Sequence, residues 1–371
     1  MGQLFFQLLQ VSVGRRDRLD TVPTDEQWDE LYDLSKKQSV AGICCIGVQR
    51  LPVEQRPYRR LLLRWYTLSQ KIRTRNDNTT EVARLLSRAI EKDGFDTCVM
   101  KGQSNYIYYP EAMQGMRSCG DIDLWLRPKQ PMRHPVKATI DYLERKGAIV
   151  SLCYLHAEVK SVKKVPVELH FRPSFINEPL HNRRFQRIFQ DMEACVEPCE
   201  TLGFRVMKTE YNLLFQLNHI FRHLIDEGVG MRQLLDFHFL LLSPKAQQSI
   251  ARGEFDSPLR RLGMRRIAGA LMWVLHEVLS LPSDQMLCPP NERDGRFLLD
   301  EVMLAGNFGH HDPRLKELEV RRGKTSYQLR HAWRRFRRNL RFLGTYPSEV
   351  VCEPLARVVH FWWRRFRWWR F

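Results

Sequence analysis

The chain has 371 residues, of which 43% are hydrophobic and 11% aromatic, and it carries a formal net charge of +17 at pH 7. These values exclude a disordered chain, and the length is sufficient for two or three domains. No segment approaches the run of about 18 apolar residues that a membrane-spanning helix needs, and the N-terminus lacks the features of a signal peptide. The basic excess favours acidic partners such as nucleotides, nucleic acid or an anionic membrane surface.

Residues 1–94 are predicted to form an N-terminal helical region. Thr24 precedes Asp-Glu-Gln and then apolar residues at helical spacing, which is a typical helix start. A longer amphipathic run extends from Tyr58 to Ala89, and we expect a turn within it at the Asn-rich residues 76–78.

Residues 95–200 alternate between strand and helix patterns. We expect helices from Ser104 and over 134–146, and short apolar, partly β-branched segments predict strands at 95–100, 120–126, 148–154 and 163–171. This alternation favours an α+β fold in which a small mixed sheet lies between two helical regions.

Residues 201–371 return to helical patterns, which are strongest over 211–225 and 231–242. Their last part, residues 321–371, contains 14 Lys and Arg residues but two acidic residues. Two amphipathic stripes lie in this tail, and they consist of Leu329, Trp333, Phe336, Leu340 and Leu343, and of Val359, Trp362, Trp363 and Phe366.

Three acidic residues form the main candidate site. Asp121 and Asp123 lie two positions apart in GDIDLW, so on a strand they point to the same face. Such a pair needs either water or a cation between its charges. Glu168 lies on a later predicted strand, and if that strand neighbours the first, three carboxylates meet. This is the arrangement that a two-metal phosphoryl-transfer site needs.

A glycine-containing turn precedes these carboxylates. Lys101-Gly102-Gln103-Ser104 follows one predicted strand and leads into a helix. Such a turn presents backbone N–H groups to phosphate oxygens, and Lys101 or Arg117 would add positive charge there.

The order of these features resembles the nucleotidyltransferase superfamily typified by DNA polymerase beta. More narrowly, the sequence is similar over roughly residues 20–350 to a bacterial family usually described as uncharacterised nucleotidyltransferases. The motifs of that family match Lys101-Gly102, Arg117, Gly120–Leu124 and Val167–His170. The chain departs from the wider superfamily at Gln103, where many members have Gly-Gly-Ser or Gly-Ser in the turn.

The resemblance implies a transferase that moves a nucleoside monophosphate from an NTP, such as ATP, to an acceptor and releases pyrophosphate. It implies Mg²⁺ or Mn²⁺ bound by the catalytic carboxylates Asp121, Asp123 and Glu168. The nucleotide would be bound by Lys101, Gly102, Ser104, Arg117 and Gly120. The acceptor stays open, because an RNA end, a protein side chain, an amine and a sugar all suit this chemistry.

Five further residues are accessory candidates, and each has a structural alternative. His170 shares the strand face of Glu168. The family's paired histidines and later aspartate match positions in the C-terminal half. His219 and His223 lie one helical turn apart, as do Arg232 and Asp236. The alternatives are histidines that pack the helices against the core, and an ion pair within one helix.

Two other functions are compatible with the sequence. The first is a catalytically silent protein of this fold that binds nucleic acid through the tail, where Arg and aromatic residues suit phosphates and bases. The second is attachment of the tail to an anionic membrane surface. A helical lid with buried Trp residues is the structural alternative. The nine cysteines lack zinc-site spacing, so we expect reduced thiols in a cytoplasmic protein.

Overall fold

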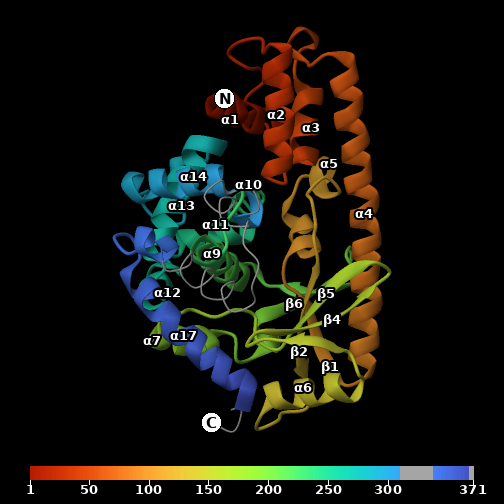
Figure 1. Ribbon diagram of the computed structural model, residues 1–371, viewed down its shortest axis with the longest axis vertical. Coiled ribbons are helices and arrows are strands. Elements are labelled where there is room, and N and C mark those ends of the chain that lie inside the picture. Colours follow the sequence, from red (N-terminus) through yellow and green to blue (C-terminus); the bar gives the residue numbers. More distant parts are fainter. Residues whose placement is uncertain (310–336, 367–371) are drawn as a thin grey trace, which may run out of the picture.

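The computed structural model describes residues 1–309 and 337–366. The N-terminal region is helical, as predicted, and consists of α1 (Gly2–Ser12), α2 (Asp25–Lys37), α3 (Ala41–Arg50), the 3-10 turn η1 (Val53–Gln55) and α4 (Arg59–Lys92). Thr24 caps α2 through a reciprocal pair of hydrogen bonds with Gln27, so the predicted start of this helix is confirmed. Figure 1 shows α4 running the length of the molecule along one side of the sheet.

The expected turn at residues 76–78 was wrong, because α4 continues through it. Asn76 is buried, and its side-chain amide donates to the carbonyl oxygens of Gly115 and Arg117 at 2.9 and 2.7 Å. Its side-chain oxygen accepts from the backbone N–H of Cys119 at 3.3 Å. The asparagine therefore holds the loop before GDIDLW against the helix and does not break the helix.

Residues 95–207 form one seven-stranded mixed sheet with the order β3-β4-β5-β2-β1-β7-β6. β2 pairs with β5, and β1 with β7, in parallel, while the other neighbours are antiparallel. The predicted α+β fold is therefore confirmed. The strands are β1 (Phe95–Val99), β2 (Ile122–Pro128), β3 (Ile149–Leu152), β4 (His156–Val162), β5 (Val165–His170), β6 (Val196–Cys199) and β7 (Phe204–Met207).

Three of these strands were not predicted. β4 lies between two predicted strands and is mostly polar and exposed, so it lacks the apolar signal of a buried strand. β6 and β7 are four residues long, and β6 contains a proline at the edge of the sheet. β4 pairs with β3 and β5, which flank it in the chain, and β7 pairs with both β6 and the distant β1. This pairing stabilises all three strands, and the residues within each strand carry only a weak signal for it.

The two faces of the sheet are covered by different helices. Leu124 of β2 and Val167 of β5 point to the face that packs in one hydrophobic cluster with α4 and with α6 (Pro135–Arg145). Trp125 points to the other face and belongs to the large cluster shared by the N-terminal and C-terminal helices. Side chains alternate along a strand, so Asp123 shares the face of Trp125 and projects toward the C-terminal helices.

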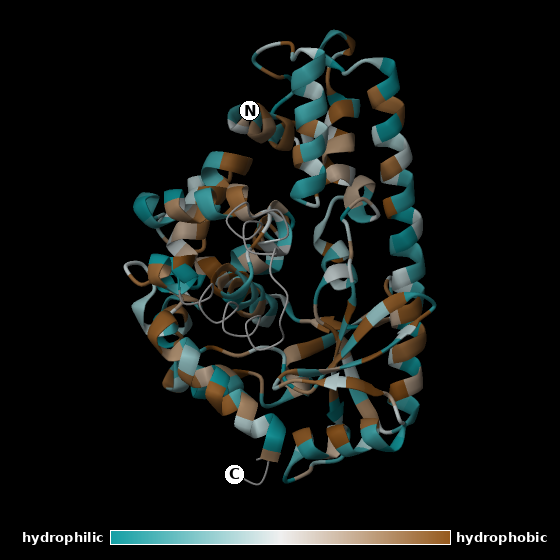
Figure 2. Ribbon diagram, in the orientation of Figure 1, coloured by the Kyte–Doolittle hydropathy of each residue, from teal (hydrophilic) through white to brown (hydrophobic). Residues whose placement is uncertain are grey.

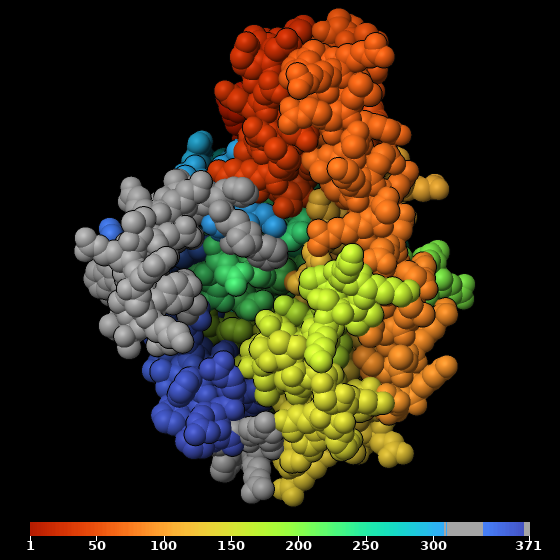
Figure 3. Space-filling view, turned by 45° about the vertical axis from the view of Figure 1, so that its right-hand side comes forward, coloured from red at the N-terminus to blue at the C-terminus, as the bar shows by residue number. Residues whose placement is uncertain are grey.

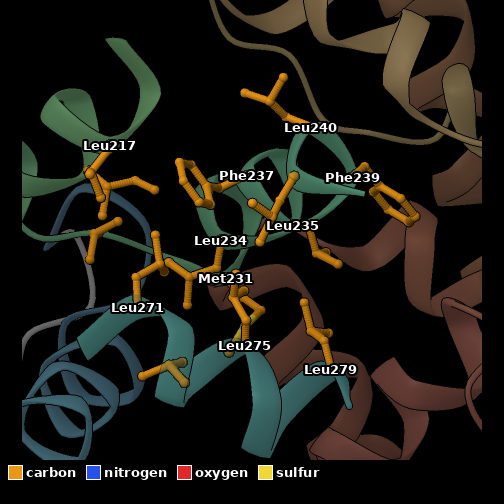
Figure 4. Packing of buried hydrophobic residues seen from close by; sticks show 14 of the residues in the cluster. Leu217, Met231, Leu234, Leu235, Phe237, Phe239, Leu240, Leu271, Leu275 and Leu279 are labelled. Carbon is orange, nitrogen blue, oxygen red and sulfur yellow. The ribbon is translucent and has the colours of Figure 1, made fainter. Parts of the chain in front are cut away.

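The C-terminal region packs around α9 (Thr209–Asp226) and α10 (Met231–Leu241). In Figure 4, Leu234 and Met231 of α10 lie against Leu271 and Leu275 of α13 (Arg265–Leu279). None of the helices in the described part of the chain is long and apolar enough to cross a membrane. The helices of this region are α7 (Pro179–Ile188), α8 (Met192–Cys195), α9 (Thr209–Asp226), α10 (Met231–Leu241), α11 (Pro244–Ala251), α12 (Asp256–Arg261), α13 (Arg265–Leu279), α14 (Glu292–Ala305) and α17 (Pro347–Phe366).

Helix α17 attaches to the rest of the molecule through a face rich in polar groups. Glu349 is buried and accepts the backbone N–H groups of Asn177 and Glu178 at 2.8 and 3.3 Å. Arg357 bonds to Asp226 of α9 at 3.0 Å. Brown, hydrophobic positions recur along the helix in Figure 2, and its residues form part of the molecular surface in Figure 3.

The second predicted stripe of the tail needs a correction. Trp363 is buried against Phe171, whereas Trp362 is exposed. Adjacent helical residues are rotated by about 100°, so these two tryptophans occupy different faces of α17. Of the first stripe, Leu329, Trp333 and Phe336 lie outside the described residues.

Burial raises the pKa of Glu349 to about 7, despite the two backbone hydrogen bonds that oppose the shift. The folded protein therefore binds more protons than the unfolded chain between about pH 4.5 and 7, and stability falls as pH rises through this window. We predict that Glu349→Gln removes this decline, so that the variant exceeds wild type at pH 8 by up to about 3 kcal/mol in free energy of unfolding. Urea denaturation at pH 5 and pH 8 measures the difference, with exposed Glu30→Gln as the control. An identical pH dependence for Glu349→Gln and wild type would contradict the prediction.

Candidate active site

The pairing of β2 with β5 brings three carboxylates together. In the parallel register of these strands, Asp123 lies opposite Glu168. Parallel neighbours in register share a sheet face, so both side chains project to the same side. Asp121 immediately precedes β2, and carboxylate oxygens of the three residues lie within 4.8 Å of one another.

Two basic groups lie beside these carboxylates. Nζ of Lys101 lies 3.0 Å from Oδ2 of Asp123 and 4.0 Å from Oδ2 of Asp121. Nε2 of His170 lies 3.1 Å from Oδ1 of Asp123 and 3.2 Å from Oε2 of Glu168. Asp123, which is 1% exposed, therefore has a basic group beside each of its oxygens.

The contacts shift the pKa values of both partners. Burial acts to raise the pKa of Asp123, but Lys101 and His170 outweigh it and lower that pKa. Burial acts in the same way on Glu168, but the hydrogen bond and charge of His170 bring its pKa to about 2. The carboxylates in turn raise the pKa of Lys101 and of His170 against the effect of burial. Asp123 and Glu168 are therefore ionised at neutral pH.

The turn after β1 places Lys101 beside this cluster. Gly102 has a φ of +70°, in the left-handed region that favours glycine, and it begins the 3-10 helix η2 (Gly102–Tyr108). A helix from Ser104 was expected, and η2 occupies that position. Gln103 and Ser104 are buried, and neither side chain makes a hydrogen bond within the described residues. The two polar residues of the turn therefore lie in the interior and not on an open surface.

A small pocket with a cavity volume of about 10 Å³ lies between this turn and the helices α9 and α10. On the side of the sheet it is lined by Lys101, Gly102, Arg117, Gly120 and Asp121. On the side of the helices it is lined by Gln216, His219, Arg232, Gln233 and Asp236. The pocket thus unites the predicted nucleotide-binding residues, except Ser104, with three of the accessory candidates. Gln216 and Gln233 were not predicted, since a glutamine within a helical pattern carries no functional signal.

Arg117 attaches α10 to the loop before β2. Its Nε and Nη2 donate to the two carboxylate oxygens of Asp236 at 2.8 and 2.5 Å. Tyr109 donates its hydroxyl to the same carboxylate at 2.7 Å, and Nη1 of Arg232 donates to the carbonyl oxygen of Ser118 at 2.9 Å. The structural alternative for Arg232 and Asp236 was an ion pair within one helix. Both side chains instead form hydrogen bonds with the loop before β2.

The paired histidines lie on α9, with their ring centroids 4.3 Å apart. His219 lines the pocket, while Nδ1 of His223 lies 3.3 Å from a carboxylate oxygen of Glu227. Burial lowers the pKa of both histidines. Both rings are therefore neutral at pH 7 and are suited to hydrogen bonding. Within the described residues, neither ring belongs to a group of side chains close enough to share a metal ion.

His156 was not predicted as a site residue. It begins β4, which pairs antiparallel with β5, and it lies opposite His170 in that register. Its Nδ1 is 3.3 Å from Oε2 of Glu168. Prediction of His156 as a site residue would have required prediction of β4, the strand that precedes Val-Glu-Leu-His. That strand was missed because it is polar.

The profile of a family described as "Uncharacterised nucleotidyltransferase" matches residues 24–280. No curated protein matches the chain. A solved structure, an antigenic nucleotidyltransferase-like protein from Paracoccidioides brasiliensis, is similar with 13% sequence identity and a TM-score of 0.30. That similarity covers 50% of this chain and 93% of the other.

The ion pair between Arg117 and Asp236 is buried, so its removal should be costly. We predict that Asp236→Ala lowers the free energy of unfolding by about 3–5 kcal/mol, because it leaves the guanidinium of Arg117 buried without its carboxylate. Asp33→Ala is the control, since Asp33 pairs with Lys36 on an exposed helix surface and its loss should change stability by less than about 1 kcal/mol. Urea denaturation measures both, and equal effects would show that the buried pair contributes no more than a surface pair.

Proposed function

The chain belongs to the uncharacterised nucleotidyltransferase family, and we propose that it transfers a nucleoside monophosphate from a nucleoside triphosphate to an acceptor hydroxyl or amine, with release of pyrophosphate. The observation that carries this proposal is the convergence of Asp121, Asp123 and Glu168 beside the Lys101-Gly102 turn.

The donor set fits a hard divalent cation. Three carboxylates offer oxygen ligands of the kind that Mg²⁺ and Mn²⁺ prefer. Oδ2 of Asp123 is buried, and Nζ of Lys101 lies 3.0 Å from it. When bound, the cation would supply charge stabilisation to the oxygens of the transferred phosphoryl group.

Within this proposal the remaining pocket residues hold the triphosphate. Lys101, Gly102 and Gly120 line the pocket next to Asp121, and Arg117 adds positive charge from the pocket wall while it stays bonded to Asp236. Ser104, which is buried, completes the turn. Glu168 completes the set of metal ligands and helps to deprotonate the acceptor.

We predict that Asp121→Asn and Asp123→Asn each reduce nucleotidyl transfer by at least about 100-fold, because each removes a negative charge that holds the cation. The measurement uses purified full-length protein, each labelled NTP with Mg²⁺ or Mn²⁺, and RNA, protein and small-molecule acceptors. Asp284→Asn is the matched control, since this aspartate is exposed and lies outside the cluster. Equal transfer by wild type and the two site variants would contradict the proposal. Absence of transfer by wild type would favour the alternative of a catalytically silent protein of this fold.

A second proposal concerns the tail and rests on the unusual exposure of α17. Apolar residues recur along its outer face at helical spacing, and five of them are 40–63% exposed, namely Val351, Leu355, Val359, Trp362 and Phe366. A surface helix ordinarily buries its apolar face, whereas this one buries Glu349 and Glu353 together with Val350 and Trp363 and leaves the five apolar residues exposed. Such a face marks a binding surface.

The surrounding charge favours an anionic lipid surface as the partner of α17. Residues 354–371 contain five arginines and no acidic residue, so a second copy of the helix would be repelled. An apolar face edged by arginine and containing tryptophan suits the interface of an anionic membrane better than the phosphates of nucleic acid.

We predict that replacing Leu355, Val359 and Trp362 together by Ser weakens binding to phosphatidylserine-containing vesicles by at least about tenfold, because three apolar side chains no longer enter the lipid. Vesicle co-sedimentation measures this, with neutral vesicles and an RNA oligonucleotide in parallel. The control variant replaces Val22, Val53 and Leu63, which are equally exposed elsewhere, by Ser. Unchanged vesicle binding, or loss of RNA binding alone, would contradict the lipid assignment.

A further inference from the structure

A second group of potential metal ligands adjoins the three carboxylates. It consists of His156 on β4 with Glu168 and His170 on β5, whose ligand atoms lie within 4.8 Å of one another. The antiparallel register places the two histidines opposite each other, so their side chains share one face. The proposed transfer reaction gives no role to His156, and this group offers nitrogen as well as oxygen ligands.

The spacing of the ligand atoms fits a shared cation. Zinc bonds of about 2.0–2.2 Å in a tetrahedral site separate neighbouring ligand atoms by about 3.3–3.6 Å. Oε2 of Glu168 lies 3.2 Å from Nε2 of His170 and 3.3 Å from Nδ1 of His156. Oδ1 of Asp123 is a further neighbour, 3.1 Å from Nε2 of His170.

Hydrogen bonding does not explain the position of His156. Its Nδ1 is buried and makes no hydrogen bond within the described residues, although the carboxylate of Glu168 is close. The separation of 3.3 Å between this nitrogen and Oε2 of Glu168 is the spacing that two ligands of one tetrahedral ion have.

The orientation of His170 has a similar explanation. Its Nδ1 lies 3.3 Å from the carbonyl oxygen of Arg172, which directs Nε2 toward Glu168 and Asp123. Histidines that bind metal through one ring nitrogen commonly donate the other N–H to a backbone carbonyl, and this contact fixes the ring. The carbonyl oxygen of Arg172 therefore lies where the hydrogen-bond acceptor of a metal-binding histidine is commonly found.

We propose that His156, Glu168 and His170 form a second cation site that takes a divalent transition metal of the zinc or cobalt type. Imidazole nitrogen suits these ions, whereas Mg²⁺ prefers oxygen ligands alone. The inference rests on the proposed function only through Glu168, which belongs to both groups and links the two cations. An ion bound to the histidines holds Glu168 beside Asp123 and selects which metals the protein retains.

Cobalt tests the site because its visible absorption reports nitrogen ligands and needs no enzymatic activity. Full-length protein is freed of metal with a chelator and titrated with Co²⁺ in excess Mg²⁺. We expect one equivalent of Co²⁺ to produce visible bands, and His156→Ala to weaken this binding by at least about tenfold. His134→Ala is the matched control, because His134 precedes α6 and lies outside the group. His156→Gln, with circular dichroism of each variant, separates loss of a ligand from loss of folding.

Asp121→Asn distinguishes this inference from the proposed function. Asp121 is not among the ligands of the second group, so its substitution should leave the Co²⁺ bands in place even if transfer is lost. Bands that survive in Asp121→Asn and disappear in both His156 variants support the site whether or not transfer is detected. Absence of Co²⁺ binding by wild type overturns the inference. Bands that depend on Asp121 and not on His156 overturn it as well, because the cation would then lie at the carboxylates alone.

Discussion

The burial of Asp123 is the constraint on which the arrangement of this molecule depends. A carboxylate that is almost inaccessible to solvent must be paired, because an isolated buried charge costs several kcal/mol. Lys101 follows β1 and His170 ends β5, so the first position depends on the pairing of β1 with β2 and the second on the register in which β5 lies beside β2. A shift of one residue in that register would turn Glu168 and His170 to the opposite face and leave Asp123 without half of its partners.

The same requirement links the sheet to the C-terminal helices. Because Asp123 and Glu168 project from the face of Trp125, the residues that close the site must come from the helices that cover this face. Arg117 and Asp236 make this closure through a bidentate buried ion pair, and α10 is thereby fixed to the loop before β2. The pocket beside Asp121 exists because these two parts of the chain meet, and it is walled by residues from both.

Features that depend on alternation along one strand, or on periodicity along one helix, could be predicted from the sequence. Asp121, Asp123 and Glu168 were grouped because period-two patterns placed them on strand faces, and the structure brings them together. β4 and His156 were missed because that strand is polar, and Asn76 was misread as a turn because its partners lie about 40 residues further along the chain. Asp236 was compared with its neighbour on the helix, whereas its partner Arg117 lies 119 positions away. Contacts of this kind depend on tertiary packing and leave no local pattern.

The tail is connected to the site by a short chain of contacts. Trp363 of α17 packs on Phe171, the residue that follows His170, and the guanidinium of Arg172 lies close to the rings of both Tyr154 and Trp363. The carbonyl of this same Arg172 lies 3.3 Å from Nδ1 of His170. The inner face of α17 thus supports the backbone that orients a histidine beside Asp123 and Glu168, while its outer face is exposed and apolar. The two faces of α17 therefore have different roles. The inner face helps to fix the geometry of the carboxylates, so a partner that binds the outer face would contact a helix that supports the site.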